Sequence, residues 1–116
     1  MHVLVAEDQE MVRVALVRIL TRLGCIVTAA SGGREAATVF MRTERITAVV
    51  SDFDMNGGGN GRELYEAIRD ELKARNGRFM IVTGDMPHFD REWFEEQGVP
   101  VIWKPVLPDD LKRFLS

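Results

Sequence analysis

The sequence has 116 residues, of which 46% are hydrophobic and 28% charged, the size and composition of one globular domain. Its 15 basic and 18 acidic residues give a net charge of −3, which argues against binding to nucleic acid or to a membrane surface. The single cysteine, Cys25, excludes an internal disulfide and an all-cysteine zinc site, and it agrees with a cytoplasmic location. No apolar run is long enough to span a membrane, and Glu7 and Asp8 end the first run too early for a signal peptide.

The first half of the chain predicts three strands separated by two helices. The strands are the short apolar runs His2–Ala6, Cys25–Ala29 and Ile46–Ser51. The first helix ends at Gly24, and the second begins with Ser31 as its N-cap. The residues expected to face inward from these two helices are Val12, Ala15, Leu16, Ile19, Leu20, Leu23, Ala36, Ala37, Phe40 and Met41.

The second half begins with a glycine-rich loop and then continues the alternation. Four of the six residues of Asn56–Gly61 are glycine, so we expect few side chains to hold this loop in place. Arg78–Thr83 and Val99–Trp103 predict the fourth and fifth strands, with a short helix from Pro87 to Gln97 between them. Two further helices carry the inward-facing residues Leu64, Ile68, Leu72, Leu111, Phe114 and Leu115.

Five strands that alternate with amphipathic helices predict an α/β fold. The strands are nearly all apolar, which is typical of a parallel sheet covered by helices on both faces. Right-handed crossovers then give a doubly wound sheet, and residues 1–116 form a single domain. Functional residues of such a sheet lie at the carboxyl ends of its strands.

The predicted strand ends carry reactive side chains. They are Glu7, Asp8, Asp52, Asp54, Thr83 and Lys104. Any one of them is explained as a solvated loop residue or a cap. Together they are not, because crowded carboxylates repel one another and a parallel sheet needs none of these side chains to fold. Mg²⁺ prefers oxygen ligands of this kind, and an Asp carboxylate is a competent phosphoryl acceptor. Three carboxylates are balanced in charge by Mg²⁺ and Lys104, so the pattern favours phosphoryl transfer.

In this order, these residues resemble the site of response-regulator receiver domains of two-component signalling. The resemblance covers essentially the whole chain, and it rests on the pair Glu7-Asp8, on Asp52, on Thr83 and on Lys104-Pro105. It implies the flavodoxin-like (βα)5 form of the doubly wound fold, with a five-stranded parallel sheet in the order 2-1-3-4-5. It also implies a signalling domain rather than an enzyme.

The resemblance assigns a role to each site residue. Asp52 would be the phosphoacceptor, Thr83 would hydrogen-bond the phosphoryl group and Lys104 would pair with it. The Lys104–Pro105 peptide bond would be cis. The implied ligands of Mg²⁺, or of Mn²⁺ in its place, are Glu7, Asp8, Asp52 and the backbone carbonyl of Asp54.

The implied phosphoryl donor is a phosphohistidine on a sensor histidine kinase or a histidine phosphotransfer domain. The segments GRELYEAIRDEL (61–72), IVTGD (81–85) and GVPVIWKPV (98–106) resemble receivers attached to hybrid sensor histidine kinases. The short last helix, Pro108–Ser116, favours a piece of such a protein, whereas Met1 is what a stand-alone receiver would begin with. The sequence does not choose between these two, and it names no kinase, signal, output or oligomeric state.

Three positions depart from the family pattern. Asn56 stands where proline is usual, and Val101 stands where the family has a switching aromatic residue. Trp103 is unusually large and shares the parity of Val101 along the strand, so both should face the fourth and fifth helices, where the family binds partners. Trp103 is therefore expected either to anchor a partner or to pack against Trp93 and Phe94.

An enzyme is the main alternative. Asp52 and Asp54 after an apolar strand resemble the DxD motif of haloacid-dehalogenase-type phosphatases, in which they would be nucleophile and acid/base. Against it, only Asp109 and Asp110 are left for the further metal-binding motif, and the acidic pair after the first strand has no role. A receiver-like module that is never phosphorylated is disfavoured by the complete set of site residues. A flavin-binding protein is disfavoured because the loop after the first strand is acidic.

Overall fold

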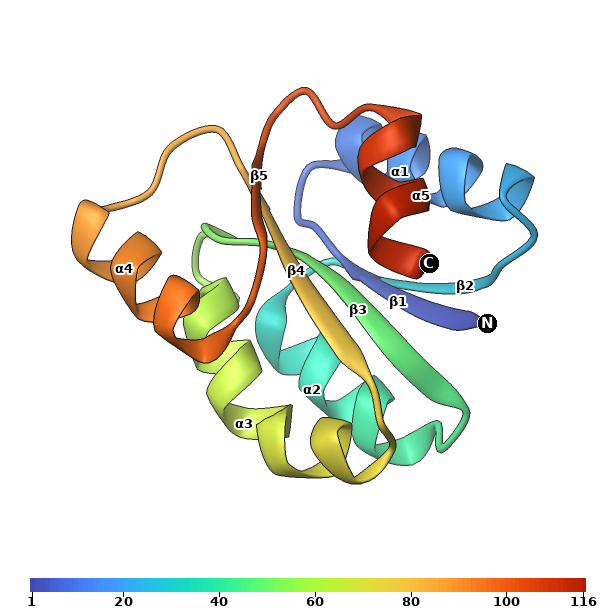
Figure 1. The fold of residues 1–116 in the computed structure, drawn as a ribbon, viewed down its shortest axis with the longest axis horizontal. Coiled ribbons are helices and arrows are strands. Elements are labelled where there is room, and N and C mark those ends of the chain that lie inside the picture. Colours follow the sequence, from blue (N-terminus) through green and yellow to red (C-terminus); the bar gives the residue numbers. More distant parts are fainter.

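The computed structural model describes residues 1–116, in which five strands alternate with five helices (Figure 1). The strands are β1 (His2–Ala6), β2 (Ile26–Ala30), β3 (Ile46–Asp52), β4 (Arg78–Thr83) and β5 (Val101–Trp103). The helices are α1 (Glu10–Arg22), α2 (Gly33–Arg42), α3 (Gly61–Ala74), α4 (His88–Gln97) and α5 (Pro108–Leu115). All neighbouring strands are parallel, in the order β2-β1-β3-β4-β5, which confirms the predicted doubly wound, flavodoxin-like sheet. None of the helices combines the length and the apolar character that crossing a membrane requires.

Helices cover both faces of the sheet: α1 and α5 lie on one face, and α2, α3 and α4 lie on the other (Figure 1). Successive side chains of a strand point to opposite faces, so each face has its own hydrophobic cluster. In β1, Val3 and Val5 belong to the cluster under α1 and α5, whereas Leu4 and Ala6 belong to the other cluster. The strands are therefore apolar on both faces, as a sheet buried between two helical layers requires.

Two strands begin later than predicted. β2 begins at Ile26, because the amide of Cys25 still donates to the carbonyl of Leu20 at 3.1 Å in the turn after α1. β5 begins at Val101, because Pro100 has no N–H to donate to the sheet. Both differences depend on which backbone groups can form hydrogen bonds, and the spacing of hydrophobic residues does not report this.

Ser31 was predicted to be the N-cap of α2, but it does not cap the helix. Gly32 is the N-cap residue, and the Ser31 hydroxyl instead donates to Glu35 Oε2 at 2.8 Å. Three residues predicted to face inward are exposed: Leu23 (38%), Met41 (54%) and Ala15, which lines a surface groove. Leu23 lies beyond the last residue of α1, and Met41 follows the buried Phe40 and is turned about 100° away from it around α2.

Close packing brings α3 against the end of β3. A Cβ atom at Gly61 would lie 2.6 Å from Ile81 Cδ1 and 2.8 Å from the carbonyl oxygen of Asp52, so only glycine lets α3 start at this place.

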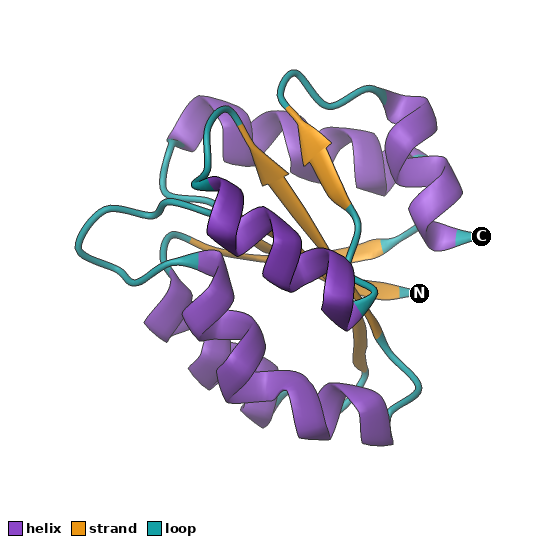
Figure 2. Cartoon of the chain, turned by 60° about the vertical axis from the view of Figure 1, so that its left-hand side comes forward, coloured by secondary structure: helices purple, strands orange, loops and turns teal.

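At the end of β5, the Lys104–Pro105 peptide bond is cis, as predicted. Figure 2 shows the visible strand arrows pointing toward one edge of the sheet, where loops gather. The functional side chains lie at this edge.

Candidate functional site

A pocket of about 390 Å³ with an entirely non-hydrophobic lining lies at the carboxyl ends of the strands. Its lining residues are Asp8, Gln9, Asp52, Asp54, Asn56, Thr83, Gly84, Asp85 and Lys104. The strand order explains why these residues meet: β1 and β3 are neighbours, and β3 is followed by β4 and β5. A doubly wound sheet forms its crevice at the point where the strand order reverses, which here is between β1 and β3.

Three carboxylates form the acidic part of this site. Glu7, Asp8 and Asp52 each offer an oxygen atom, and these oxygens all lie within 4.8 Å of one another. Glu7 is fully buried and Asp52 is 6% exposed, whereas Asp8 is half-buried. Lys104 Nζ donates to Glu7 Oε1 at 2.9 Å and lies 3.4 Å from Asp52 Oδ1. One ammonium thus contacts two of the three carboxylates.

The electrostatics of the cluster follow from this crowding. Burial raises the pKa of Asp52, and the neighbouring Glu7 raises it further, so that it moves from 3.8 to about 6 against the lowering effect of Lys104. Burial alone would lower the pKa of Lys104, but the hydrogen bond to Glu7 and the charges of Asp52 and Glu7 outweigh burial and raise it. Lys104 therefore stays an ammonium. Burial and the repulsion from Glu7 disfavour the ionised form of Asp52, and an additional positive charge in the site would stabilise it.

Thr83 closes β4 beside the cluster, and its hydroxyl faces the following loop. Thr83 is 1% exposed, its Oγ1 donates to the carbonyl of Asp85 at 2.7 Å, and it accepts from the amide of Asp85 at 3.2 Å. These bonds form a local turn of the kind that Thr favours after a strand. The hydroxyl proton is thus engaged by the carbonyl of Asp85, and its donation into the pocket that Thr83 lines requires this bond to break.

Asp54 and Asn56 line the pocket from the loop after β3. Asp54 Oδ1 accepts from the amide of Asn56 at 3.2 Å, and Asn56 Nδ2 donates to Asp8 Oδ2 at 2.9 Å. The sequence predicted Asn56 only as the start of a loosely held loop, and it gave no sign of this contact. An Asn-Gly pair is a turn signal, but the partner of the amide is 48 residues away along the chain.

The donor set fits a hard divalent cation. Mg²⁺ binds oxygen ligands, commonly one or two carboxylates together with waters and substrate phosphate. Glu7, Asp8 and Asp52 supply only oxygen atoms, and the pocket beside them is open enough for water. Asp54, whose backbone carbonyl is the fourth predicted ligand, lines the same pocket.

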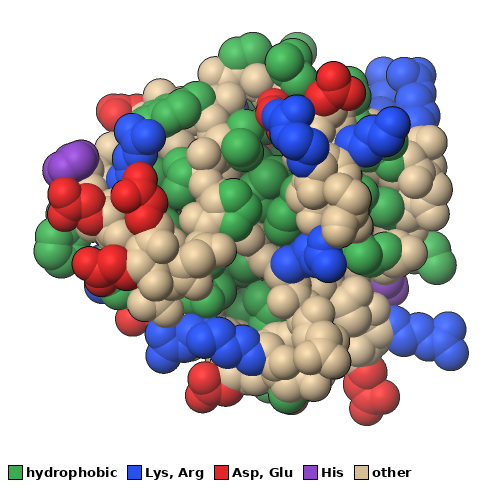
Figure 3. Space-filling view, in the orientation of Figure 1, with side chains coloured by type: hydrophobic (Ala, Val, Ile, Leu, Met, Phe, Trp, Pro, Cys, Tyr) green, Lys and Arg blue, Asp and Glu red, His purple; other side chains and the backbone are tan.

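Val101 and Trp103 lie outside the pocket, on the face that α4 covers. Val101 packs partly buried against the hydrophobic cluster of that face, and Trp103 is 43% exposed. Arg91 of α4 holds its guanidinium carbon 5.4 Å from the centre of the Trp103 ring. Both side chains therefore face α4 but not α5, which covers the opposite face of the sheet, so the predicted side is right for only one of the two helices. The indole lies beside Arg91 rather than in an aromatic pair with Trp93 or Phe94. Figure 3 shows hydrophobic side chains along the middle of this view, flanked by charged ones.

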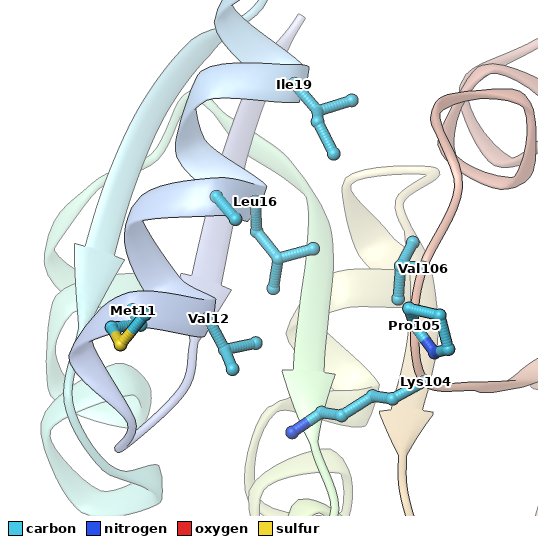
Figure 4. Close-up of a pocket in the computed structure, with 8 residues that line it drawn as sticks. Met11, Val12, Leu16, Ile19, Lys104, Pro105 and Val106 are labelled. Atoms are coloured by element: carbon cyan, nitrogen blue, oxygen red, sulfur yellow. The ribbon is translucent and has the colours of Figure 1, made fainter.

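An apolar groove of about 490 Å³ adjoins the polar pocket on the side of α1. It is lined by Met11, Val12, Ala15, Leu16, Ile19, Lys104, Pro105 and Val106. Figure 4 shows Val12, Leu16 and Ile19 of α1 pointing toward Pro105 and Val106, while Lys104 extends toward the strand ends. Lys104 is the one residue that lines both the groove and the polar pocket.

The family model described as response regulator receiver domain matches residues 3–116, nearly the whole chain. The chain belongs to this family. Receiver domains are signalling domains of two-component systems, in which they interact with histidine kinases or phosphotransfer proteins, and they bind Mg²⁺ at an acidic cluster. Glu7, Asp8 and Asp52 form an acidic cluster in this receiver domain.

Several solved structures of receiver proteins have the same fold. A response regulator receiver protein from Pseudomonas putida is 28% identical, with a TM-score of 0.85 over 98% of this chain and 93% of that chain. The receiver domain of the hybrid histidine kinase CckA is 26% identical, with a TM-score of 0.79 over 99% of this chain and 95% of that chain. The chemotaxis protein CheY4 of Vibrio cholerae, 24% identical, shares the fold with a TM-score of 0.82 over 98% and 94%. No curated protein matches the sequence.

The phosphatase alternative is not favoured by the family match, and the site disfavours it as well. Asp109 and Asp110 lie at the start of α5, where Asp110 Oδ1 accepts from Arg113 at 2.7 Å. Neither residue lines the polar pocket, whereas Glu7 and Asp8, which the phosphatase pattern leaves without a role, belong to the acidic cluster.

Proposed function

We propose that this receiver domain accepts a phosphoryl group on Asp52 from a phosphohistidine. The observation that carries the proposal is the position of Asp52 at the end of β3, with Lys104 Nζ 3.4 Å from its Oδ1 and the Glu7 and Asp8 carboxylates beside it. A nucleophilic carboxylate, a fixed ammonium and a set of metal-binding oxygens are the groups that phosphoryl transfer to a carboxylate requires.

In the proposed reaction, a carboxylate oxygen of Asp52 attacks the phosphorus atom of the donor. An O–P bond forms while the P–N bond to the donor imidazole breaks, and the imidazole leaves with the bonding electron pair. Lys104 pairs with the phosphoryl oxygens, and the Thr83 hydroxyl leaves the carbonyl of Asp85 and donates to them. Hydrolysis of the aspartyl-phosphate by water later restores the carboxylate, which ends the phosphorylated state and frees Asp52 for another phosphoryl group.

Glu7, Asp8, Asp52 and the backbone carbonyl of Asp54 would hold Mg²⁺, with Mn²⁺ as a substitute. The bound cation supplies positive charge that neutralises the phosphoryl oxygens during transfer. Of the protein's own groups, Lys104 already holds Glu7 and Asp52 close together, so two of these ligands are positioned by the fold.

The test is phosphoryl uptake from acetyl phosphate with Mg²⁺, measured by intact-protein mass spectrometry. The wild-type protein is expected to gain one acyl phosphate per chain, and Asp52→Asn is expected to gain none, because an amide is a poor nucleophile. Asp54→Asn is the matched control and is expected to keep uptake, since only its backbone carbonyl is implicated. Many turnovers of acetyl phosphate would identify a phosphatase, and label on Asp52→Asn at another position would contradict the assignment.

The proposed setting is a cytoplasmic two-component phosphorelay with a sensor histidine kinase or a histidine phosphotransfer domain as donor. A hybrid histidine kinase as the parent protein is supported by the likeness to the CckA receiver. A histidine kinase core encoded directly upstream in the same gene would establish the hybrid arrangement, and a separate reading frame would contradict it.

We also propose that Trp103, rather than Val101, reports phosphorylation on the α4 face. Val101 is half-buried and β-branched, so its side chain has one strongly restricted torsion and cannot swing as a large aromatic can. Trp103 is 43% exposed beside Arg91, where a shift of α4 would change the surroundings of its ring and any partner that contacts it.

Trp103 emission is therefore expected to respond to phosphorylation. The sequence has two tryptophans, so Trp93→Phe leaves Trp103 as the sole emitter, and its spectrum should shift when beryllofluoride and Mg²⁺ occupy the site. Trp103→Ala should fold and keep full phosphoryl uptake at Asp52, because its ring lies outside the pocket. An unchanged emission spectrum, or loss of uptake or folding in Trp103→Ala, would show that Trp103 has no reporting role.

A further inference from the structure

Asn56 holds an uncommon backbone conformation beside the acidic cluster. Its φ angle is 40°, in the left-handed region that Asn tolerates better than most residues with a side chain. From this position its side chain turns back over the strand ends, and Nδ2 donates to Asp8 Oδ2 at 2.9 Å. The contact joins the loop after β3 to the loop after β1.

The loop that carries Asn56 is closed at its base. Asp54 and Asn60 form an isolated antiparallel bridge, and the amide of Gly61 donates to the carbonyl of Phe53 at 2.7 Å. Within the loop, Asp54 Oδ1 accepts from the amide of Asn56 at 3.2 Å, which fixes the turn from which the Asn56 side chain projects.

The far side of the same loop is packed on α2. The carbonyl of Gly58 accepts from the amide of Arg34 at 3.1 Å. A Cβ atom at Gly58 would lie 3.2 Å from Gly32 Cα, so the two backbones approach as closely as glycine allows. The loop thus has one attachment to α2 and another, through Asn56, to Asp8.

Asp8 depends on Asn56 more than the other two carboxylates do. Glu7 and Asp52 both contact Lys104, at 2.9 Å and 3.4 Å. The Asp8 carboxylate makes no salt bridge, and the amide of Asn56 is its only hydrogen-bond donor. Asp8 is also the least buried of the three acidic residues, so without Asn56 its carboxylate would have no hydrogen-bonded partner in the protein.

We propose that Asn56 is a positioning residue for Asp8. Through this contact it couples Mg²⁺ binding to the conformation in which the glycine-rich loop Asn56–Gly61 is attached to Asp8. This inference rests on the proposed function, in which Asp8 is a Mg²⁺ ligand. A carboxylate has two oxygens: the neutral Asn56 amide donates to Oδ2, so Oδ1 would remain available to a cation. A hydrogen bond to the outer oxygen of a metal-binding carboxylate fixes its orientation, and losing such a bond typically weakens metal binding about 10-fold or more.

The test is the Mg²⁺ dissociation constant, measured by isothermal titration calorimetry on the wild-type protein and three variants. Asn56→Ala and Asn56→Gly both remove the amide, and Gly also relieves the left-handed backbone, so both should bind Mg²⁺ about 10-fold more weakly. Asn76→Ala is the matched control: Asn76 has a φ angle of 55° and is exposed at the end of α3, far from the site in the chain. Its Mg²⁺ affinity should stay within about twofold of the wild type.

Hydrogen exchange provides a second readout that does not depend on phosphorylation. Mg²⁺ should slow exchange of the amides of residues 57–61 in the wild type, and it should do so much less in Asn56→Gly. Equal Mg²⁺ affinity in the wild type and both Asn56 variants, or tighter binding in the variants, would overturn the positioning role while leaving the proposed function intact. A wild-type protein that binds no Mg²⁺ would contradict the proposed function itself.

Discussion

Asp52→Asn is expected to raise the free energy of unfolding at pH 8 by about 2 kcal/mol in metal-free buffer, and by much less at pH 4. The pKa of Asp52 is raised in the native state from 3.8 to about 6 by burial and by Glu7, so between these pH values the native protein holds a proton that the unfolded chain has lost. Wild-type stability therefore falls as the pH rises through this interval, and the cost is complete above about pH 6. An amide never carries the charge, so the variant avoids this cost.

Urea denaturation from pH 4 to pH 8, with EDTA present, measures this difference. A pKa difference of about 2 corresponds to about 3 kcal/mol, and the expected gain is smaller because a buried amide retains some desolvation cost. Asp54→Asn makes the same chemical change at an exposed carboxylate and should leave the pH dependence as in the wild type. Equal or lower stability of Asp52→Asn at pH 8 would mean that the contact with Lys104 outweighs the burial and repulsion of the carboxylate.

The reactive groups of the site were predictable because topology alone brings them together. Asp52, Thr83 and Lys104 each stand at or just after the end of an apolar run, and parallel strands place such ends along one edge of the sheet. That Val101 and Trp103 share a face followed in the same way, because side chains two apart on a strand point to the same side. Which helices cover that face was only implied by the family resemblance, and the structure places α4 there but not α5. Predictions of this kind need only periodicity and strand order.

Contacts between distant loops were not predictable in this way. The bond from Asn56 to Asp8 joins positions 48 residues apart, and the Thr83 hydroxyl has a choice of acceptors that only the conformation of the next loop decides. Arg75 is a third case: it occupies the C-cap of α3, and its guanidinium donates to carbonyls up to 35 residues away. Local patterns carry no information on which backbone oxygens lie opposite a long side chain.

Arg75→Ala is expected to lower the free energy of unfolding by about 3 kcal/mol. The Arg75 side chain is 9% exposed, and its Nη1 donates to the carbonyls of Thr43 at 2.9 Å and Ile46 at 3.0 Å. Its Nη2 donates to the carbonyl of Phe40 at 3.1 Å, its guanidinium carbon lies 4.0 Å from the centre of the Phe40 ring, and its Nε pairs with Glu71 at 2.8 Å. One side chain thus satisfies carbonyls at the end of α2 and the start of β3, and alanine leaves all of them without this donor.

Guanidine or urea denaturation of Arg75→Ala, Arg75→Lys and the control Arg69→Ala measures this contribution. Lysine keeps the positive charge but lacks the planar fork, so one ammonium cannot reach three carbonyls and most of the stability should still be lost. Arg69, on the same helix, is 36% exposed and contacts Gln97 at 3.2 Å, and its replacement should cost less than about 1 kcal/mol. Arg75→Lys with wild-type stability would show that charge alone accounts for the effect, and equal losses at positions 75 and 69 would show that the carbonyls gain nothing from Arg75. Because Arg75 holds the end of the sheet opposite the strand-end pocket, Arg75→Ala should still take up one phosphoryl group per chain wherever it remains folded.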